Sequence, residues 1–183
     1  MHSELRFAMK KIENKDLNRV SVEEFATTAK RRIILIADNI RSSNNVGSLF
    51  RTADAFAIEE IWLCGITATP PDREIHKTAL GAELTIPWKK FQTTAEAVAA
   101  LREMNYEVVA VEQVEGACSL ENFEPAPTGC GLILGNEVKG VDQEVVNMCD
   151  RAVEIPQWGT KHSLNVSVSA GVVLWQCVSK SLK

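Results

Sequence analysis

The chain lacks long hydrophobic segments. Its longest apolar runs, such as residues 33–37 and 108–111, are far shorter than the roughly 20 residues of a membrane-spanning helix. The N-terminus also lacks the continuous apolar stretch of a secretory signal peptide, because charged residues are scattered through it. We therefore expect a cytoplasmic protein that has no membrane partner.

Cysteine and histidine are scarce and are not grouped as metal ligands. The five cysteines form no CxxC pair, and an odd number without such pairs does not indicate a disulfide framework or a zinc site. The histidines, His2, His76 and His162, lie far apart in the sequence and lack metal-ligand spacing. We expect reduced, mostly buried thiols and no bound metal.

Three common motifs are missing as well. No G-x-G-x-x-G follows the first predicted strand, and the chain has neither a P-loop nor a G-x-S-x-G nucleophile motif. The missing glycine motif argues against a nucleotide-binding oxidoreductase of the usual kind.

The net charge of −4 conceals an asymmetry along the chain. Residues 1–32 hold eight Lys and Arg against five Asp and Glu, whereas residues 33–183 hold 12 against 19. The acidic body argues mildly against a nucleic-acid partner, while the basic N-terminal segment argues for one. That segment fits either a solvent-exposed helix face or an RNA contact, and composition alone does not decide between them.

The chain has enough apolar sequence for one core, because 45% of its 183 residues are hydrophobic. Apolar blocks of strand length alternate with helical segments, which is typical of an α/β fold whose parallel sheet is covered on both faces. The pattern predicts strands at 32–37, 61–64, 84–86, 107–111, 131–134 and 152–155, and helices at 45–56, 74–80, 94–103, 142–148 and 163–180.

The first thirty residues are predicted to be helical. Leu5, Met9 and Ile12 share one helical face, and residues 21–24 have the spacing of a capping box before a second short helix. We therefore divide the chain into a basic helical extension, residues 1–31, and one domain, residues 32–183.

Three loops that follow predicted strands are rich in polar and small residues: 38–47, 135–140 and 156–165. Each loop alone could be an ordinary turn or helix cap. Ligands of open parallel sheets bind at the carboxyl ends of the strands, so three such loops at one edge predict a binding site.

These loops carry the motifs of a known family. Residues 45–53 read NVGSLFRTA, residues 132–141 read LILGNEVKGV, and residues 155–168 contain IPQWG and SLNVSV. In motif order and spacing, from about residue 32 to residue 178, the chain closely resembles the SpoU (TrmH-like) RNA ribose 2′-O-methyltransferases of the SPOUT superfamily. The resemblance implies a Rossmann-like sheet with a C-terminal trefoil knot, S-adenosylmethionine as cofactor, a tRNA or rRNA substrate and a homodimer.

The resemblance also implies the site residues by their positions in the motifs. The family's catalytic residues fall on Asn45, Arg51, Glu137, Ser163 and Asn165. Its cofactor-binding residues fall on Leu134, Gly135, Asn136, Ile155, Pro156 and Leu164. Asn45, Ser163 and Asn165 would orient Arg51 and the ribose, and Glu137 would fix a loop or a cationic partner.

Two roles are open for Arg51. Methyl transfer to a ribose hydroxyl requires an O2′ that is deprotonated, or nearly so, in line with the sulfonium methyl. Neutralising a free guanidinium at pH 7 costs roughly 7 kcal/mol, because its pKa is about 12.5 or more. Arg51 would therefore act as a strongly perturbed base or as an electrostatic stabiliser of the developing alkoxide.

The chain departs from the family pattern in its loops. Ser42-Ser43 stands where many relatives have Asp-Pro, and Gln157-Trp158 stands where Met is common. These differences concern loop shape and the choice of RNA more than the chemistry. The alternative function is that of a catalytically idle RNA-binding relative, and the intact set of catalytic side chains argues against it.

Overall fold

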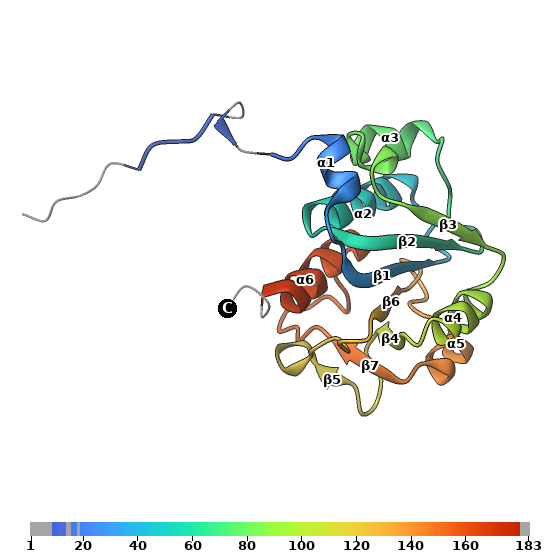
Figure 1. Cartoon of the computed structure of the whole chain (residues 1–183). Coiled ribbons are helices and arrows are strands. Elements are labelled where there is room, and N and C mark those ends of the chain that lie inside the picture. The colour runs from blue at the N-terminus through green and yellow to red at the C-terminus, as the bar shows by residue number, and fades with distance from the viewer. Residues whose placement is uncertain (1–8, 14–15, 18, 180–183) are drawn as a thin grey trace, which may run out of the picture.

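The computed structural model describes residues 9–13, 16–17 and 19–179. Its centre is a seven-stranded sheet in the order β3-β2-β1-β6-β4-β7-β5, and every strand pair in it is parallel (Figure 1). The predicted α/β class with a parallel sheet is thus confirmed. The implied trefoil knot stays a prediction.

The described elements have the following bounds. The strands are β1 (Arg31–Asp38), β2 (Ile58–Cys64), β3 (Trp88–Phe91), β4 (Glu107–Val111), β5 (Cys118–Ser119), β6 (Cys130–Leu134) and β7 (Arg151–Glu154). The α-helices are α1 (Val22–Thr27), α2 (Ser43–Ala55), α3 (Arg73–Ala79), α4 (Thr94–Glu103), α5 (Gln143–Met148) and α6 (Val166–Ser179).

The central strands are apolar throughout because helices cover both faces of the sheet. Along β1, Ile33, Leu35 and Ala37 pack in one core cluster with residues of α2, α3 and α6. Ile34 and Ile36 point to the opposite face, where they pack with residues of α4 and α5. This alternation follows from the two-residue period of a strand.

One predicted strand is wrong in position. Residues 84–86 do not join the sheet, and a 3₁₀ helix at Ala82–Leu84 occupies part of that stretch. The carbonyl of Ala82 accepts hydrogen bonds from the amides of Thr85 and Ile86, at 3.1 and 3.0 Å. Because these amides are used in the turn, pairing with β2 begins only at Pro87, whose carbonyl accepts from the amide of Ile61 at 3.0 Å, and continues in β3.

Two further boundaries differ from the sequence pattern. The last helix begins at Val166 rather than at Ser163, because Asn165 acts as its N-cap: its Oδ1 accepts from the amide of Ser167 at 2.9 Å. The short strand β5 lies in a segment predicted only as a loop, and it pairs with β7.

The N-terminal extension is only partly helical. Ser21 and Glu24 form the predicted capping box of α1. Residues 9–13 carry no regular structure, and the Met9 side chain is fully exposed, so the helix predicted there is wrong over these residues. Without an apolar surface to pack against, so short a helix is unstable in water. Leu5 lies outside the described residues.

The five cysteines are free thiols, as predicted. Three of them are buried, and burial raises the pKa of the Cys64 thiol to about 12. None of the helices in the described part of the chain is both long and apolar enough to span a membrane.

Thr67 joins two loops at the carboxyl edge of the sheet. Its hydroxyl donates to the carbonyl of Ala37 at 3.0 Å and accepts from the amide of Ile40 at 2.9 Å. Only 2% of Thr67 is exposed, so water cannot replace these partners.

We expect the variant Thr67→Val to lose about 1–3 kcal/mol of unfolding free energy, because it leaves a buried amide and a buried carbonyl unsatisfied. Urea denaturation followed by circular dichroism measures this loss. The exposed Thr27 provides the control, and Thr27→Val should change the unfolding free energy by less than about 0.5 kcal/mol. Equal effects of the two substitutions would contradict the assigned role of Thr67.

Candidate active site

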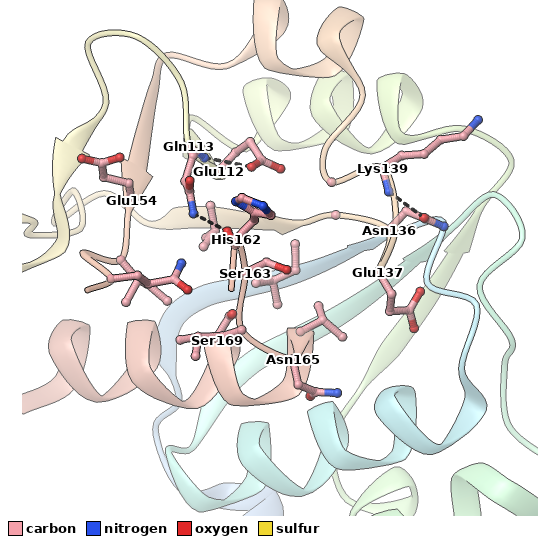
Figure 2. Close-up of a pocket in the computed structure, with 18 of the residues that line it drawn as sticks. Glu112, Gln113, Asn136, Glu137, Lys139, Glu154, His162, Ser163, Asn165 and Ser169 are labelled. Carbon is pink, nitrogen blue, oxygen red and sulfur yellow. Dashed lines mark hydrogen bonds between the residues drawn. The ribbon is translucent and has the colours of Figure 1, made fainter. Parts of the chain in front are cut away.

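A cavity of about 540 Å³ lies at the carboxyl ends of β4, β6 and β7 (Figure 2). Residues 111–113, 134–140 and 153–155 end these strands, and residues 162–166 close the cavity from the side of α6. Two of the three predicted loops, 135–140 and 156–165, therefore meet at one edge, as parallel strands require.

The loop after β6 is a tight turn. Asn136 and Gly140 exchange two backbone hydrogen bonds, of 3.0 and 2.9 Å. A Cβ atom at Gly135 would lie 2.1 Å from the carbonyl carbon of Gly140, so only glycine fits there. Nδ2 of the Asn136 side chain donates to the backbone carbonyl of Asn39 at 2.8 Å, and this bond attaches the turn to the loop after β1.

Glu137 attaches the same turn to the start of α2. Its carboxylate accepts from the amides of Arg41 and Ser42 at 2.9 and 3.1 Å, and from Nδ2 of Asn45 at 2.9 Å. Asn165 continues the cluster, because its Nδ2 donates to Oδ1 of Asn45 at 3.1 Å. Figure 2 shows Glu137 and Asn165 on the side of the cavity that faces α2.

Two side chains at the end of β4 connect the remaining loops. Oε2 of Glu112 accepts from the amide of Val141 at 2.8 Å. Nε2 of Gln113 donates to the carbonyl of His162 at 2.9 Å (Figure 2). Neither residue belongs to the site predicted from the sequence. Both directly follow the predicted strand 107–111, which could have indicated them, but the loop that they begin carries no family motif.

The model of the SpoU rRNA Methylase family matches residues 32–175, which hold nearly all of β1, all of β2 to β7 and most of α6. The chain belongs to the SpoU family.

Curated relatives agree with this assignment. The 23S rRNA (guanosine-2′-O-)-methyltransferase RlmB of Neisseria meningitidis serogroup B is 31% identical over 142 residues, 78% of this chain and 56% of that protein. The tRNA (guanosine(18)-2′-O)-methyltransferase TARBP1 of Mus musculus is 29% identical over 82% of this chain and 10% of its own length. This SpoU-family chain thus spans little more than half the length of the RlmB relative.

Solved structures share the fold. An AdoMet-bound rRNA methyltransferase from Sinorhizobium meliloti matches with a TM-score of 0.78 and 25% identity, over 87% of this chain and 61% of that one. The A. aeolicus TrmH/SpoU tRNA-modifying enzyme matches with a TM-score of 0.74 and 22% identity, over 85% of this chain and 78% of that one.

The residues carried over from the SpoU motifs divide into three groups. Ser163, Glu137 and Asn165 line the cavity. Asn45 does not line it, but its side chain is hydrogen-bonded to both Glu137 and Asn165. Five of the six cofactor positions also line it, whereas Pro156 does not. Arg51 is exposed on α2 and does not line the cavity of its own chain.

The departures from the family pattern have local consequences. Ser42 is the N-cap of α2, and its hydroxyl accepts from the amide of Asn45 at 3.3 Å. Trp158 is 93% exposed in the loop after β7, so its ring is available to a partner.

The environment of Glu137 favours its ionised form. Burial raises the pKa of this carboxyl, but the hydrogen bonds from Arg41, Asn45 and Ser42 lower it by more, so the pKa lies below its ordinary value of 4.5. A carboxyl whose folded pKa is lowered stabilises the fold fully above its unfolded pKa, and the stabilisation disappears as the pH falls through the folded pKa.

We therefore expect the difference in unfolding free energy between the protein and Glu137→Gln to be constant at neutral pH and to shrink below about pH 4.5. Urea titrations between pH 7 and pH 3.5 measure it. Glu115→Gln is the control, since Glu115 is exposed and accepts no hydrogen bond from the described residues. The same pH dependence for both variants would contradict the proposed hydrogen-bonding role.

Proposed function

We propose that this chain transfers a methyl group from S-adenosylmethionine to a ribose 2′-hydroxyl of tRNA or rRNA. The observation that carries the proposal is the meeting of SpoU motif loops around one cavity, with Asn45, Glu137 and Asn165 joined by hydrogen bonds. Relatives named as RNA 2′-O-methyltransferases support the reaction and the substrate class. A substrate of this class fits the cytoplasmic location that the sequence predicts.

The residues of the cavity fit S-adenosylmethionine. A volume of about 540 Å³ is in the range of small-molecule sites. Leu134, Val153 and Ile155 provide apolar surface for an adenine ring, and Glu112 and Glu154 provide acceptors for hydroxyl or ammonium groups. The bound cofactor would supply a methyl group attached to a positively charged sulfur, which these carboxylates also favour.

Arg51 fits the role of a charge stabiliser better than that of a base. Loss of a guanidinium proton requires strong burial, whereas Arg51 is exposed on α2. We propose that its planar donor group binds the ribose oxygen and an adjacent phosphate when RNA covers this surface. Asn45, Ser163 and Asn165 would orient the ribose, and Glu137 would hold the loop that carries Asn45.

A homodimer is part of the proposal. In the sequence, small or apolar residues stand on nearly every side of the last helix, whereas within the described chain α6 buries only one side. Val168, Val172 and Trp175 form an exposed apolar stripe on it, at 50, 37 and 56% exposure. We propose that this α6 stripe packs against the same stripe of a second copy, in a self-complementary interface.

Methylation of RNA is the direct test of the proposed function. We expect a 2′-O-methylated nucleoside after incubation with S-adenosylmethionine and total tRNA or rRNA lacking the modification, because the proposed reaction leaves the methyl group on a ribose 2′-oxygen. Mass spectrometry of nuclease-digested RNA identifies the product. A methyl group on a base, or no transfer to either RNA, would reject the proposal.

Arg51→Ala should reduce methyl transfer by at least about 100-fold while S-adenosylmethionine affinity stays within about twofold, since removing one charge-stabilising donor has effects of this size. Single-turnover assays and calorimetric titration measure the two quantities. Arg51→Lys should not restore the rate, because an ammonium lacks the planar donor pair. Arg73→Ala, on the exposed start of α3, is the control for loss of a surface arginine.

The dimer is tested on the α6 stripe. Sedimentation equilibrium should give about twice 20.2 kDa, and Trp175→Glu should give the monomer, because two facing carboxylates would be buried in the interface. Trp158→Glu is the matched control, since Trp158 is exposed but lies outside the stripe, and it should remain dimeric. A monomeric unmodified protein at micromolar concentration would overturn this part of the proposal.

A further inference from the structure

The tryptophan Trp158 stands outside the folded core. Its exposed fraction is 93%, whereas Trp62 is 1% exposed and Trp88 is partly buried against the core. A tryptophan stabilises a fold through the apolar area that it buries, and Trp158 buries almost none within its own chain. We propose that this ring stacks on a base of the RNA strand beside the nucleotide that receives the methyl group, an inference that rests on the proposed RNA substrate.

The segment around Trp158 leaves the first cavity, of about 540 Å³, and returns to it. Gln157 and His162 line this cavity, whereas residues 158–161 between them, here named the Trp158 loop, do not. Consecutive Cα atoms are about 3.8 Å apart, so the ring is attached only one residue beyond the rim of the cavity. An RNA strand whose ribose reaches the cavity therefore has a neighbouring nucleotide within reach of this ring.

The Trp158 loop stands clear of the rest of the molecule. Its residues make no hydrogen bond to the described part of the chain. A Cβ atom at Gly159 would have no neighbour within 4 Å. The loop is attached where it ends, because the carbonyl of His162 accepts from Nε2 of Gln113 at 2.9 Å (Figure 2). The ring and the backbone amides of the loop are thus available to a ligand beside the cavity.

Lys161 gives the loop a positive charge. Residues 156–165 hold this lysine and no acidic residue, and Lys161 is exposed and makes no ion pair within the described part of the chain. The first cavity is lined by Glu112, Glu137 and Glu154, which repel phosphate groups. A cation beside the cavity offsets this repulsion. An exposed aromatic ring and a nearby cation are also the two elements with which proteins bind single-stranded RNA.

A single ring among polar residues fits a base better than a protein surface. The neighbours of Trp158 in the loop are glycine, threonine and lysine. The core of a protein interface consists of contiguous apolar side chains, such as the three of the α6 stripe. Stacking requires only one flat ring, since every base has a flat face. The loop therefore lacks the character of a second dimer contact.

A second cavity, of about 360 Å³, lies across the turn after β6 and suits an RNA strand less well. Asp38 and Asp142 line it together with Arg41 and Lys139, so its acidic and basic side chains balance. A polyanion gains little from a surface without net positive charge. The Trp158 loop, with a cation, an exposed ring and no carboxylate, is the better binding surface.

Binding of two short RNAs tests the stacking. One is hexa-adenylate, and the other is an abasic hexamer with the same ribose-phosphate backbone. Fluorescence anisotropy at saturating S-adenosylhomocysteine measures both affinities. We expect the unmodified protein to bind hexa-adenylate about tenfold more tightly than the abasic RNA, because one stacked base has an effect of this size. Trp158→Ala should reduce the difference to less than about threefold by weakening binding of hexa-adenylate alone.

Matched variants separate the ring from the charge. Trp158→Phe should keep the preference for hexa-adenylate because a phenyl ring still stacks, whereas Trp158→Leu, which is apolar but not flat, should behave like Trp158→Ala. Lys161→Gln should weaken binding of both RNAs alike and make the slope of log K against log salt less steep by about 0.7, as for one phosphate contact on a single strand. Leu84→Ala and Lys77→Gln, at exposed positions of other elements, should change neither affinity.

Four results would overturn the inference. The first two are equal affinity of the unmodified protein for both RNAs, and unchanged affinity of Trp158→Ala for hexa-adenylate. The third is a dimer that dissociates in Trp158→Ala, since the ring would then pack on a second copy. The fourth is a loss of S-adenosylhomocysteine affinity in Trp158→Ala, since the ring would then belong to the cofactor site.

The binding assay and the product assay fail independently. Neither hexamer has to be methylated, so a preference for hexa-adenylate that depends on Trp158 would stand even if no methylated nucleoside were found. Conversely, a methylated ribose together with equal affinity for the two hexamers would leave the proposed function intact and remove only the stacking role of Trp158.

Discussion

The in-register pairing of four parallel strands is the constraint on which the site depends. Leu134, at the end of β6, pairs with Ala37 of β1 on one side and with Val111 of β4 on the other, and Val111 pairs with Val153 of β7. The chain therefore leaves the sheet at four adjacent points of one edge. A shift of one strand by a residue would turn its core side chains to the other face, so burial on both faces holds this alignment.

Side-chain hydrogen bonds join the loops beyond that edge to one another. Glu137 and Asn136 attach the turn after β6 to the loop after β1, while Glu112 attaches the same turn to β4. Loop segments carry unpaired amides and carbonyls, and these side chains satisfy several of them. These bonds hold the turn in one conformation, with the first cavity on one side of it and the second cavity on the other.

Two cavities of different character lie on either side of this turn. The first cavity presents carboxylates and strand-end apolar side chains, which suit a cationic adenosine compound. The second combines the buried carboxylate of Asp38 with the exposed apolar side chains of Ile66 and Val138 and with the cations of Arg41 and Lys139. The turn after β6 forms a wall of both cavities, because Asn136, Lys139 and Gly140 line each of them.

The sequence by itself determined the α/β class, most element positions and the loops that carry the site. Apolar strands such as residues 107–111 have a periodicity that depends on local spacing alone. The structure decided what distant contacts control: the turn at Ala82 displaces β3, and the cap at Asn165 delays α6. It also showed that Glu112 lines the first cavity and Asp38 the second, because only the tertiary structure brings together the distant chain segments around these side chains.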